Sequence, residues 1–469
     1  MKNSVLFEGI QSLSAWEIRQ FRQWLDSPAF NIRAEHVRLF DYLVSCIRQK
    51  RDPDEREVKV LLGISTNLEK KLRYEMSGLL DVLRHFFIWQ EMEADACRRE
   101  LYLLRAMRRR GLEKNFALAE RETERALGKT SEVSLERYQI GLQFEKEKYE
   151  WSMRQKRNQH FPFENMSQLL NAWYAGQLMQ LACIGKAQVA VQGQTKTDRE
   201  AWAVALLEHL PDRPHENQPA VALYFLGYQM LAQPNRAGHV TAFRELLKKN
   251  ASKLPPYEAQ ALLTLAINHG IRRINEGDRE AIRSTRDFYL FGLETKFLYD
   301  DRNELSRYTY NNALMIFLAL EEWDEALHFL EKYRPELAAS ERDNVYRYNL
   351  CIFHFRRGDY DTTLELLRNV TFADPMYNLE SRKMLLKIYF EQGDIGPLES
   401  LLENMLTWLR RHPEIGYHRE MYRNLARFTG RMLRIPASDK EARRRLAAKI
   451  RETPLVAERN WLLQKVEKG

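Results

Sequence analysis

Apolar side chains recur at intervals of three and four residues along most of the chain, which is the spacing of an α-helix that buries one face. Ser14 is placed to cap a helix that reaches Leu25, and the stretch 26–28 contains the stop signal Asp-Ser-Pro. The same spacing predicts further helical segments at 33–47, 54–62 and 68–87. We therefore expect residues 1–130 to form a helical N-terminal cap.

The segment 131–255 is predicted to hold a long helical hairpin followed by linker helices. One apolar stripe runs from Leu135 to Met153, and a second long helix is expected from about Glu164 to Val191. The short connection between them favours an antiparallel arrangement. Prolines interrupt the chain at Pro211, Pro214 and Pro219.

The composition supports an all-α fold. The chain has 469 residues with only 20 glycines and 15 prolines, or about 7% against the roughly 12% of average proteins. No segment shows the alternating pattern of Val, Ile and Thr that a half-buried strand requires. We expect helices throughout and no sheet.

Similar turns recur after Pro256 between consecutive apolar segments. They have the sequences Glu321-Glu322-Trp323, Gly358-Asp359-Tyr360 and Gly393-Asp394-Ile395, and their first residues are 37 and then 35 positions apart. A looser helix pair over 257–298 carries Gly277-Asp278 at its turn. A fixed period of this length predicts stacked helix pairs.

This period and these turns resemble the tetratricopeptide (TPR) repeat, a helix-turn-helix unit. The middle unit matches best, with Leu350, Cys351, Leu367 and Pro375 at the family's contact points. The other units depart from the pattern, since larger residues stand at positions that are small in the family: Leu314, Leu386 and Leu398. The resemblance implies a helical N-terminal region followed by a TPR-like right-handed α-solenoid over 256–435.

The resemblance also implies a peptide-binding groove. In TPR proteins that bind extended peptides, asparagines on the inner helices pair with the ligand backbone and lysines hold its carboxylate. The matching positions here are Asn312, Asn349, Lys383 and Lys387, with Tyr308 and Tyr348 beside them. Amide side chains suit this role because each offers a donor and an acceptor. The alternative is that these are polar residues on a solvated face, with the aromatics serving in packing.

Positive charge is concentrated at the C-terminal end. The net charge is +8, and residues 417–469 alone account for that excess. One helix face there carries a stripe of arginines, with Glu420 expected to lie off that face: Arg419, Arg423, Arg427, Arg431 and Arg434. Such a stripe predicts an exposed surface for an anionic partner, and a solvated end cap is the alternative. Residues 436–469 form a basic helix or tail in this interpretation.

Other motifs give little chemistry. The segment 61–65 followed by a helix from about Asn67 could form a helix-turn-helix, which together with the basic end keeps a nucleic-acid role as an alternative. Gln192 to Thr197 resembles a phosphate loop only superficially, because no strand precedes it and its glycine spacing is wrong. Cys46, Cys97, Cys183 and Cys351 show no metal or disulfide spacing.

The sequence thus predicts a non-catalytic scaffold or adaptor that binds another protein through a TPR-like groove. We expect no enzyme activity, no cofactor and no membrane association. A cytoplasmic location is expected because neither a hydrophobic signal segment nor an apolar run of about 20 residues is present. The alternative function is a nucleic-acid-associated regulator that uses the arginine stripe or the N-terminal helix-turn-helix.

Overall fold

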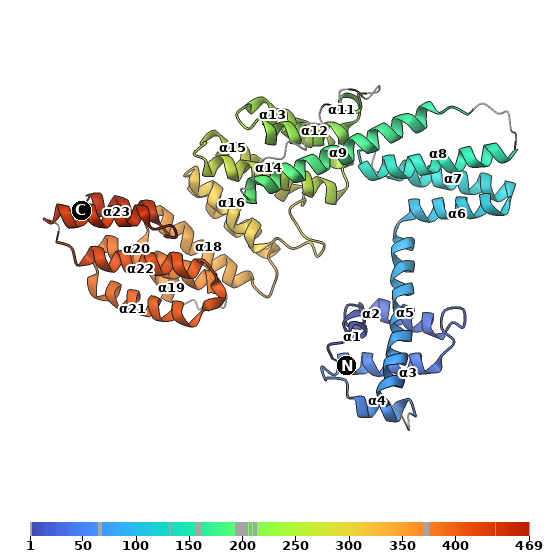
Figure 1. Ribbon diagram of the computed structural model, residues 1–469, viewed down its shortest axis with the longest axis horizontal. Coiled ribbons are helices and arrows are strands. Elements are labelled where there is room, and N and C mark those ends of the chain that lie inside the picture. The colour runs from blue at the N-terminus through green and yellow to red at the C-terminus, as the bar shows by residue number, and fades with distance from the viewer. Residues whose placement is uncertain are drawn as a thin grey trace. The chain divides into compact units, whose positions relative to one another are not determined.

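The fold is all-α, as the periodicity predicts (Figure 1). The computed structural model describes residues 2–63, 68–130, 133–155, 161–192, 205, 209, 213–368, 375–436 and 438–468. These residues contain no strand, and only the isolated bridges Tyr299–Leu305 and Leu305–Leu337 connect extended backbone. None of the helices in this part combines the length and the apolar composition needed to cross a membrane.

The chain divides into two compact units. Unit 1 comprises residues 1–178 and 202–222, and unit 2 comprises residues 179–201 and 223–469. The helices of unit 1 are α1 Val5–Gln11, α2 Ala15–Asp26, α3 Ala34–Arg48, α4 Glu55–Leu61, α5 Leu68–Ala94, α6 Ala96–Arg110, α7 Glu113–Lys129, α8 Leu135–Gln155 and α11 Pro214–Asn217. Two helices contribute residues to both units: α9 Glu164–Gln192 and α12 Pro219–Ala232.

The N-terminal bundle, α1 to α5, follows from local signals in the sequence. Ser14 accepts a hydrogen bond from the backbone N–H of Glu17, whose carboxylate accepts from the backbone N–H of Ser14, a complete capping box. Asp54 caps α4 through a single hydrogen bond that its carboxylate accepts from the N–H of Arg56. Helix α5 runs through this bundle and continues beyond it to α6 (Figure 1). The core of the bundle is apolar and aromatic, with Phe21 between Phe40 and Phe86.

Helices α8 and the first part of α9 form the predicted antiparallel hairpin. Asn165 near the start of α9 donates to Glu145 in α8 at 3.1 Å, and Leu135 at the start of α8 lies against Gly176 further along α9. The predicted proline breaks are also found where the chain is described. Pro214 begins α11 and Pro219 begins α12, in the position where a missing N–H is tolerated.

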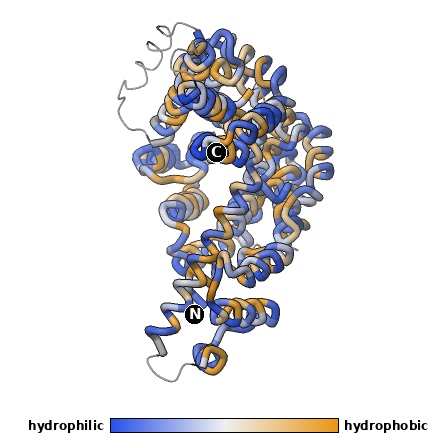
Figure 2. The backbone as a smooth tube through the Cα atoms, turned by 90° about the vertical axis from the view of Figure 1, so that its right-hand side faces the viewer, coloured by the Kyte–Doolittle hydropathy of each residue, from blue (hydrophilic) through white to orange (hydrophobic). Residues whose placement is uncertain are grey.

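Unit 2 is built from consecutive helix pairs, and from residue 256 onward each α-helix packs on the next. Its helices are α13 Ala237–Asn250, η2 Ala251–Lys253, α14 Pro256–Asn275, α15 Glu280–Glu294, α16 Arg307–Ala319, α17 Trp323–Tyr333, η3 Arg334–Glu336, α18 Arg342–Arg357, α19 Tyr360–Arg368, α20 Pro375–Gln392, α21 Ile395–Arg411, η4 Pro413–Ile415, α22 His418–Leu433, α23 Lys440–Glu452 and α24 Arg459–Lys468. Hydrophobic and hydrophilic residues are interspersed along the helices of the chain (Figure 2), as expected where one face of a helix is buried.

The predicted turns share one backbone conformation. Gly277, Glu321, Gly358 and Gly393 all have positive φ, at +96°, +57°, +84° and +76°. A left-handed residue ends the first helix of each pair, which is the usual role of glycine at this position. The aspartate that follows Gly277 then accepts hydrogen bonds from the first backbone N–H groups of α15. The alignment of the turns is therefore confirmed, whereas assignment of the pairs to the TPR family stays a prediction.

Candidate interaction sites

The two tyrosines of the predicted groove have different surroundings. Tyr308 in α16 is 67% exposed, and the guanidinium of Arg307 lies 5.0 Å from the centre of its ring. Tyr348 in α18 is buried and stacks on Tyr377 in α20, with ring centres 4.2 Å apart. Tyr308 is therefore available to a ligand, while Tyr348 joins two helices of the stack.

The two asparagines, equivalent by position, also differ. Asn312 is exposed, and its side chain forms a hydrogen bond with the hydroxyl of buried Tyr289. Burial raises the pKa of Tyr289 to about 12, and the hydrogen bond from Asn312 opposes that rise. Asn349 is fully buried, and its amide donates 2.8 Å to the carbonyl of Val345 in its own helix. A ligand cannot reach a side chain in that position. The prediction that Asn349 binds a peptide is therefore wrong.

Lys383 and Lys387 of α20 are held by a carboxylate of the chain itself. Glu458 precedes α24, and its two oxygens lie 3.3 Å from Lys383 Nζ and 2.9 Å from Lys387 Nζ. Burial opposes the ionisation of Glu458, but the two ammonium groups outweigh it and lower its pKa. The lysines do hold a carboxylate, yet this carboxylate is internal, so the prediction of an open ligand site here is corrected.

The C-terminal segment is packed firmly around this ion cluster. Val456, Leu462 and Val466 are buried in the same core as helices α20 to α23. In α24, the indole N–H of Trp461 and the ammonium of Lys465 both contact Glu391 of α20, at 3.2 and 2.6 Å. Helix α20 is consequently covered on the side where the predicted groove would continue.

The arginine stripe of α22 is only partly a free surface. Three of its members are exposed: Arg427, Arg431 and Arg434. Arg419 and Arg423 are half-buried, and Arg423 forms an ion pair with Glu420. The expectation that Glu420 lies off the stripe is wrong, because residues three apart on a helix are neighbours. The stripe thus presents fewer free cations than the sequence spacing indicates.

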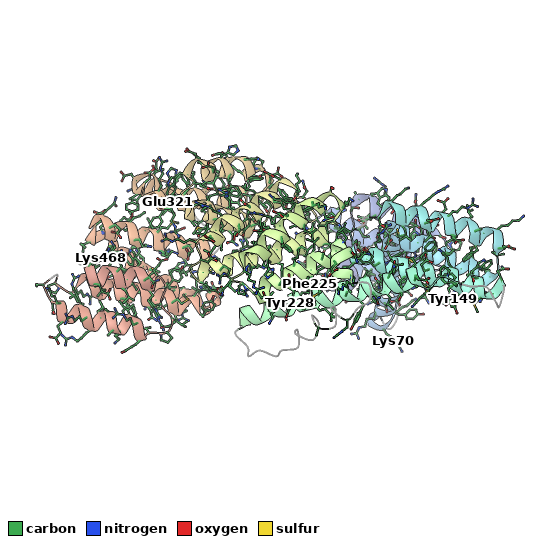
Figure 3. All side chains as sticks on the ribbon, turned by 90° about the horizontal axis from the view of Figure 1, so that it is seen from above. Lys70, Tyr149, Phe225, Tyr228, Glu321 and Lys468 are labelled. Carbon is green, nitrogen blue, oxygen red and sulfur yellow. The ribbon has the colours of Figure 1, made fainter. Side chains whose placement is uncertain are left out.

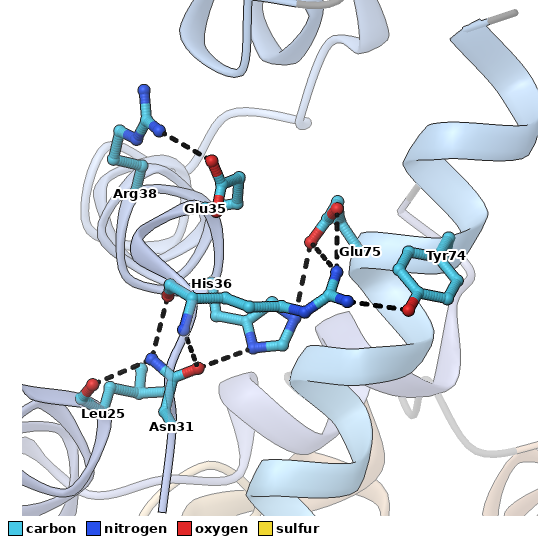
Figure 4. A network of polar contacts seen from close by, with 8 residues as sticks. Leu25, Asn31, Glu35, His36, Arg38, Tyr74 and Glu75 are labelled. Carbon is cyan, nitrogen blue, oxygen red and sulfur yellow. Dashed lines mark hydrogen bonds and ion pairs between the residues drawn. The ribbon is translucent and has the colours of Figure 1, made fainter. Parts of the chain in front are cut away.

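A buried polar network fixes the loop between α2 and α3 (Figure 4). The amide of Asn31 donates to the carbonyls of Leu25 and Arg33 at 2.8 and 3.0 Å, and its oxygen accepts from His36 Nδ1 at 2.9 Å. Glu75 of α5 lies 3.2 Å from the guanidinium of Arg33. Burial lowers the pKa of His36, so the neutral ring is the form that fits this site. The network ties the loop to α5.

An apolar cavity of about 380 Å³ lies between α15 and α17. Its aromatic lining consists of buried side chains that also belong to the core: Phe317, Phe329 and Tyr333. Half-buried Leu290 of α15 completes the apolar lining. Cavities of this size with apolar walls are suited to a large side chain or a small ligand.

Charged residues surround this cavity. Arg286 and Glu322 pair with each other on its wall, which neutralises both. The remaining rim carries more negative than positive charge: Glu294, Asp324, Glu325 and Lys332. The sequence reveals only part of this site, because Leu290 and Phe329 appear there as ordinary helix-face residues on separate helices.

Other predicted features gave no further site. The four cysteines are free and buried, and burial raises the pKa of Cys183 and of Cys351 to about 12. Across the described residues, no group of three or more His, Cys, Asp or Glu side chains could hold a metal ion. The phosphate-loop-like residues 193–197 lie outside the described residues, and so do residues 64–67 of the proposed helix-turn-helix.

Comparison with known proteins assigns no family, since no family model, no curated protein and no solved structure matches this chain.

Proposed function

We propose that this chain is a non-catalytic protein-binding module, and that the cavity between α15 and α17 takes a large apolar side chain of the partner. The observation that carries the proposal is the aromatic floor formed by Phe317, Phe329 and Tyr333 in a cavity of about 380 Å³. Interface energy is typically concentrated where one such anchor fills a desolvated pocket.

The rim indicates the character of the partner segment. Glu294, Asp324 and Glu325 leave an excess of negative charge around the apolar floor, with Lys332 as the opposing cation. A segment with an aromatic or long aliphatic residue flanked by Lys or Arg would bury its anchor and place its cations beside these carboxylates. Charge complementarity of this kind chiefly raises the association rate and the specificity.

Peptide display against the full chain tests the proposal. Selected peptides should share one large apolar residue with basic neighbours, and their affinities can be measured by fluorescence anisotropy. His328 is exposed on the cavity rim, so His328→Trp should fill the cavity without disturbing the core. We expect this variant to weaken binding of the selected peptides at least tenfold.

Leu327→Trp is the matched control, because Leu327 is 39% exposed in the same helix and does not line the cavity. Peptides that bind both variants equally would exclude the cavity as the binding site. Failure to select any peptide with an apolar anchor would count against the proposed function itself.

A further inference from the structure

A second, chemically different groove lies between α23 and α24. It has a volume of about 470 Å³, and its lining is dominated by cations: Lys440, Arg443, Arg444, Arg451 and Lys468. Buried Ala447 and Val466 form its floor. The guanidinium of Arg443 donates to the carbonyl of Val466 at 3.5 Å, so it links the two helices that make the walls.

Most of these cations have no counter-ion in the described part of the chain. Arg451 pairs with Glu467, the single carboxylate among the lining residues. Lys440, Arg444 and Lys468 are exposed. None of these three cations forms an ion pair with a described residue. Figure 3 labels Lys468 at the end of α24. The groove therefore gathers positive charge that the fold itself does not neutralise.

The lining also indicates which anion fits. Ala447 and Val466 are small and buried, and no aromatic side chain lines the groove. An acidic peptide would find no pocket for an apolar anchor, and a membrane surface would meet no exposed apolar residue to insert. Single strands usually bind by stacking their bases on aromatic rings, which are missing here. The backbone of a nucleic-acid duplex presents a regular series of phosphates that requires neither an apolar anchor nor an aromatic ring, and guanidinium groups match these phosphates well.

We propose that the groove between α23 and α24 binds the phosphate backbone of double-stranded nucleic acid without reading its sequence. This site is distinct from the arginine stripe of α22, and it is independent of the cavity between α15 and α17. The four lining cations without a carboxylate partner among the described residues are Lys440, Arg443, Arg444 and Lys468. Four such cations would contact about four phosphates, which gives an expected slope of about −3 to −4 for the logarithm of the binding constant against the logarithm of salt concentration.

The test uses the full chain and fluorescein-labelled 20-base-pair DNA and RNA duplexes of mixed sequence, titrated at several salt concentrations. Lys440→Glu with Arg444→Glu should weaken duplex binding at least tenfold and reduce the slope by about 2, because two phosphate contacts are lost. DNA and RNA duplexes of different sequence should bind alike. The single strand of the same length should bind more weakly than the duplex.

Two further variants keep the outcome decisive. Arg410→Glu with Arg411→Glu makes the same change in net charge at exposed positions of α21 and should leave binding within about threefold of the parent. Arg427→Glu with Arg431→Glu tests the stripe of α22. The proposal is overturned if the α21 or α22 pair weakens binding as much as the groove pair. It is equally overturned if poly-glutamate or anionic vesicles bind the groove and the duplexes do not.

Discussion

The carboxylate of Glu458 lies 2.9 Å from the ammonium of Lys387, across 71 positions of sequence. A third group, Lys383, contacts the other oxygen of the same carboxylate at 3.3 Å. Glu458 adopts a left-handed backbone conformation, with φ of +53°, which a non-glycine residue takes only under the constraint of its surroundings. The contact therefore fixes the C-terminal segment on α20.

Removing the charge of Glu458 should destabilise unit 2. Glu458→Gln leaves largely buried Lys387 without its carboxylate and leaves Lys383 with Glu380 alone, at 2.5 Å. We expect a loss of about 1–3 kcal/mol in the free energy of unfolding. Urea denaturation measures this loss. Glu467→Gln is the control, because that residue is exposed and its pairing with Arg451 should contribute less than about 1 kcal/mol. Equal effects of the two changes would contradict a structural role for the cluster.

The same cluster shows where sequence reasoning reaches its limit. Local signals located the elements, because a cap such as Ser14 or a turn such as Gly358 acts on residues within four positions. The ion pairs of Lys383 and Lys387 depend instead on how the chain returns from α23 to α20. Periodicity carries no information about that return. The sequence therefore predicts that Lys383 and Lys387 bind the carboxylate of a ligand, whereas they bind a carboxylate of the same chain.

Equivalent positions in successive helix pairs also fail to predict which side chain is exposed. Asn312 and Asn349 are 37 residues apart and both lie in the first helix of a pair, yet one is exposed and the other is fully buried. Burial at these positions is set by the neighbouring pairs, which differ in sequence along the stack. The arginine stripe shows the same effect, since helical spacing assigned Arg423 to an exposed stripe, whereas Arg423 is half-buried and paired with Glu420.

Replacing Glu321, labelled in Figure 3, with glycine should stabilise unit 2. Glu321 is the one non-glycine residue among the four aligned turn positions with positive φ. Glu321→Gly removes the steric cost of a side chain at φ of +57°, and we expect a gain of about 0.5–1 kcal/mol in the free energy of unfolding of unit 2. Glu325→Gly, within α17, should instead lose a similar amount. Calorimetry of both variants checks the pair, and a drop in melting temperature for Glu321→Gly would mean that its side chain stabilises the turn.

Gly78 should resist substitution, because it makes room for the buried ring of His36. A methyl group added at Gly78 would lie 2.6 Å from His36 Nε2, and the ring cannot move without breaking its bond to Asn31. We expect Gly78→Ala to destabilise unit 1 by about 1–3 kcal/mol through overpacking. Gly128→Ala in α7 meets open space and should stabilise by about 0.5–1 kcal/mol. Chemical denaturation measures the change in the free energy of unfolding for each variant. Changes of the same sign for Gly78→Ala and Gly128→Ala would rule out this steric role of Gly78.

His269 should make the stability of unit 2 depend on pH. Burial, followed by the charges of Arg272 and Arg273, lowers the pKa of His269 to about 4, against about 6.5 in the unfolded chain. The unfolded state therefore binds the proton first. The contribution of His269 is fully present above about pH 6.5 and is lost as pH falls toward 4, by about 3 kcal/mol at most.

His269→Gln tests this origin of the pH dependence, because glutamine can still accept a hydrogen bond from Arg272, which lies 3.4 Å from His269 Nδ1. The variant should flatten the plot of unfolding free energy against pH between 6.5 and 4, whatever its stability at pH 7. His239→Gln changes a half-buried histidine of the same unit that contacts Gln233, and its effect on that slope should be smaller than that of His269→Gln. A parental slope in His269→Gln would assign the acid sensitivity of unit 2 between pH 6.5 and 4 to other groups. Glu458 is not one of them, because its pKa is lowered from 4.5 and its contribution to stability is lost only below that pH.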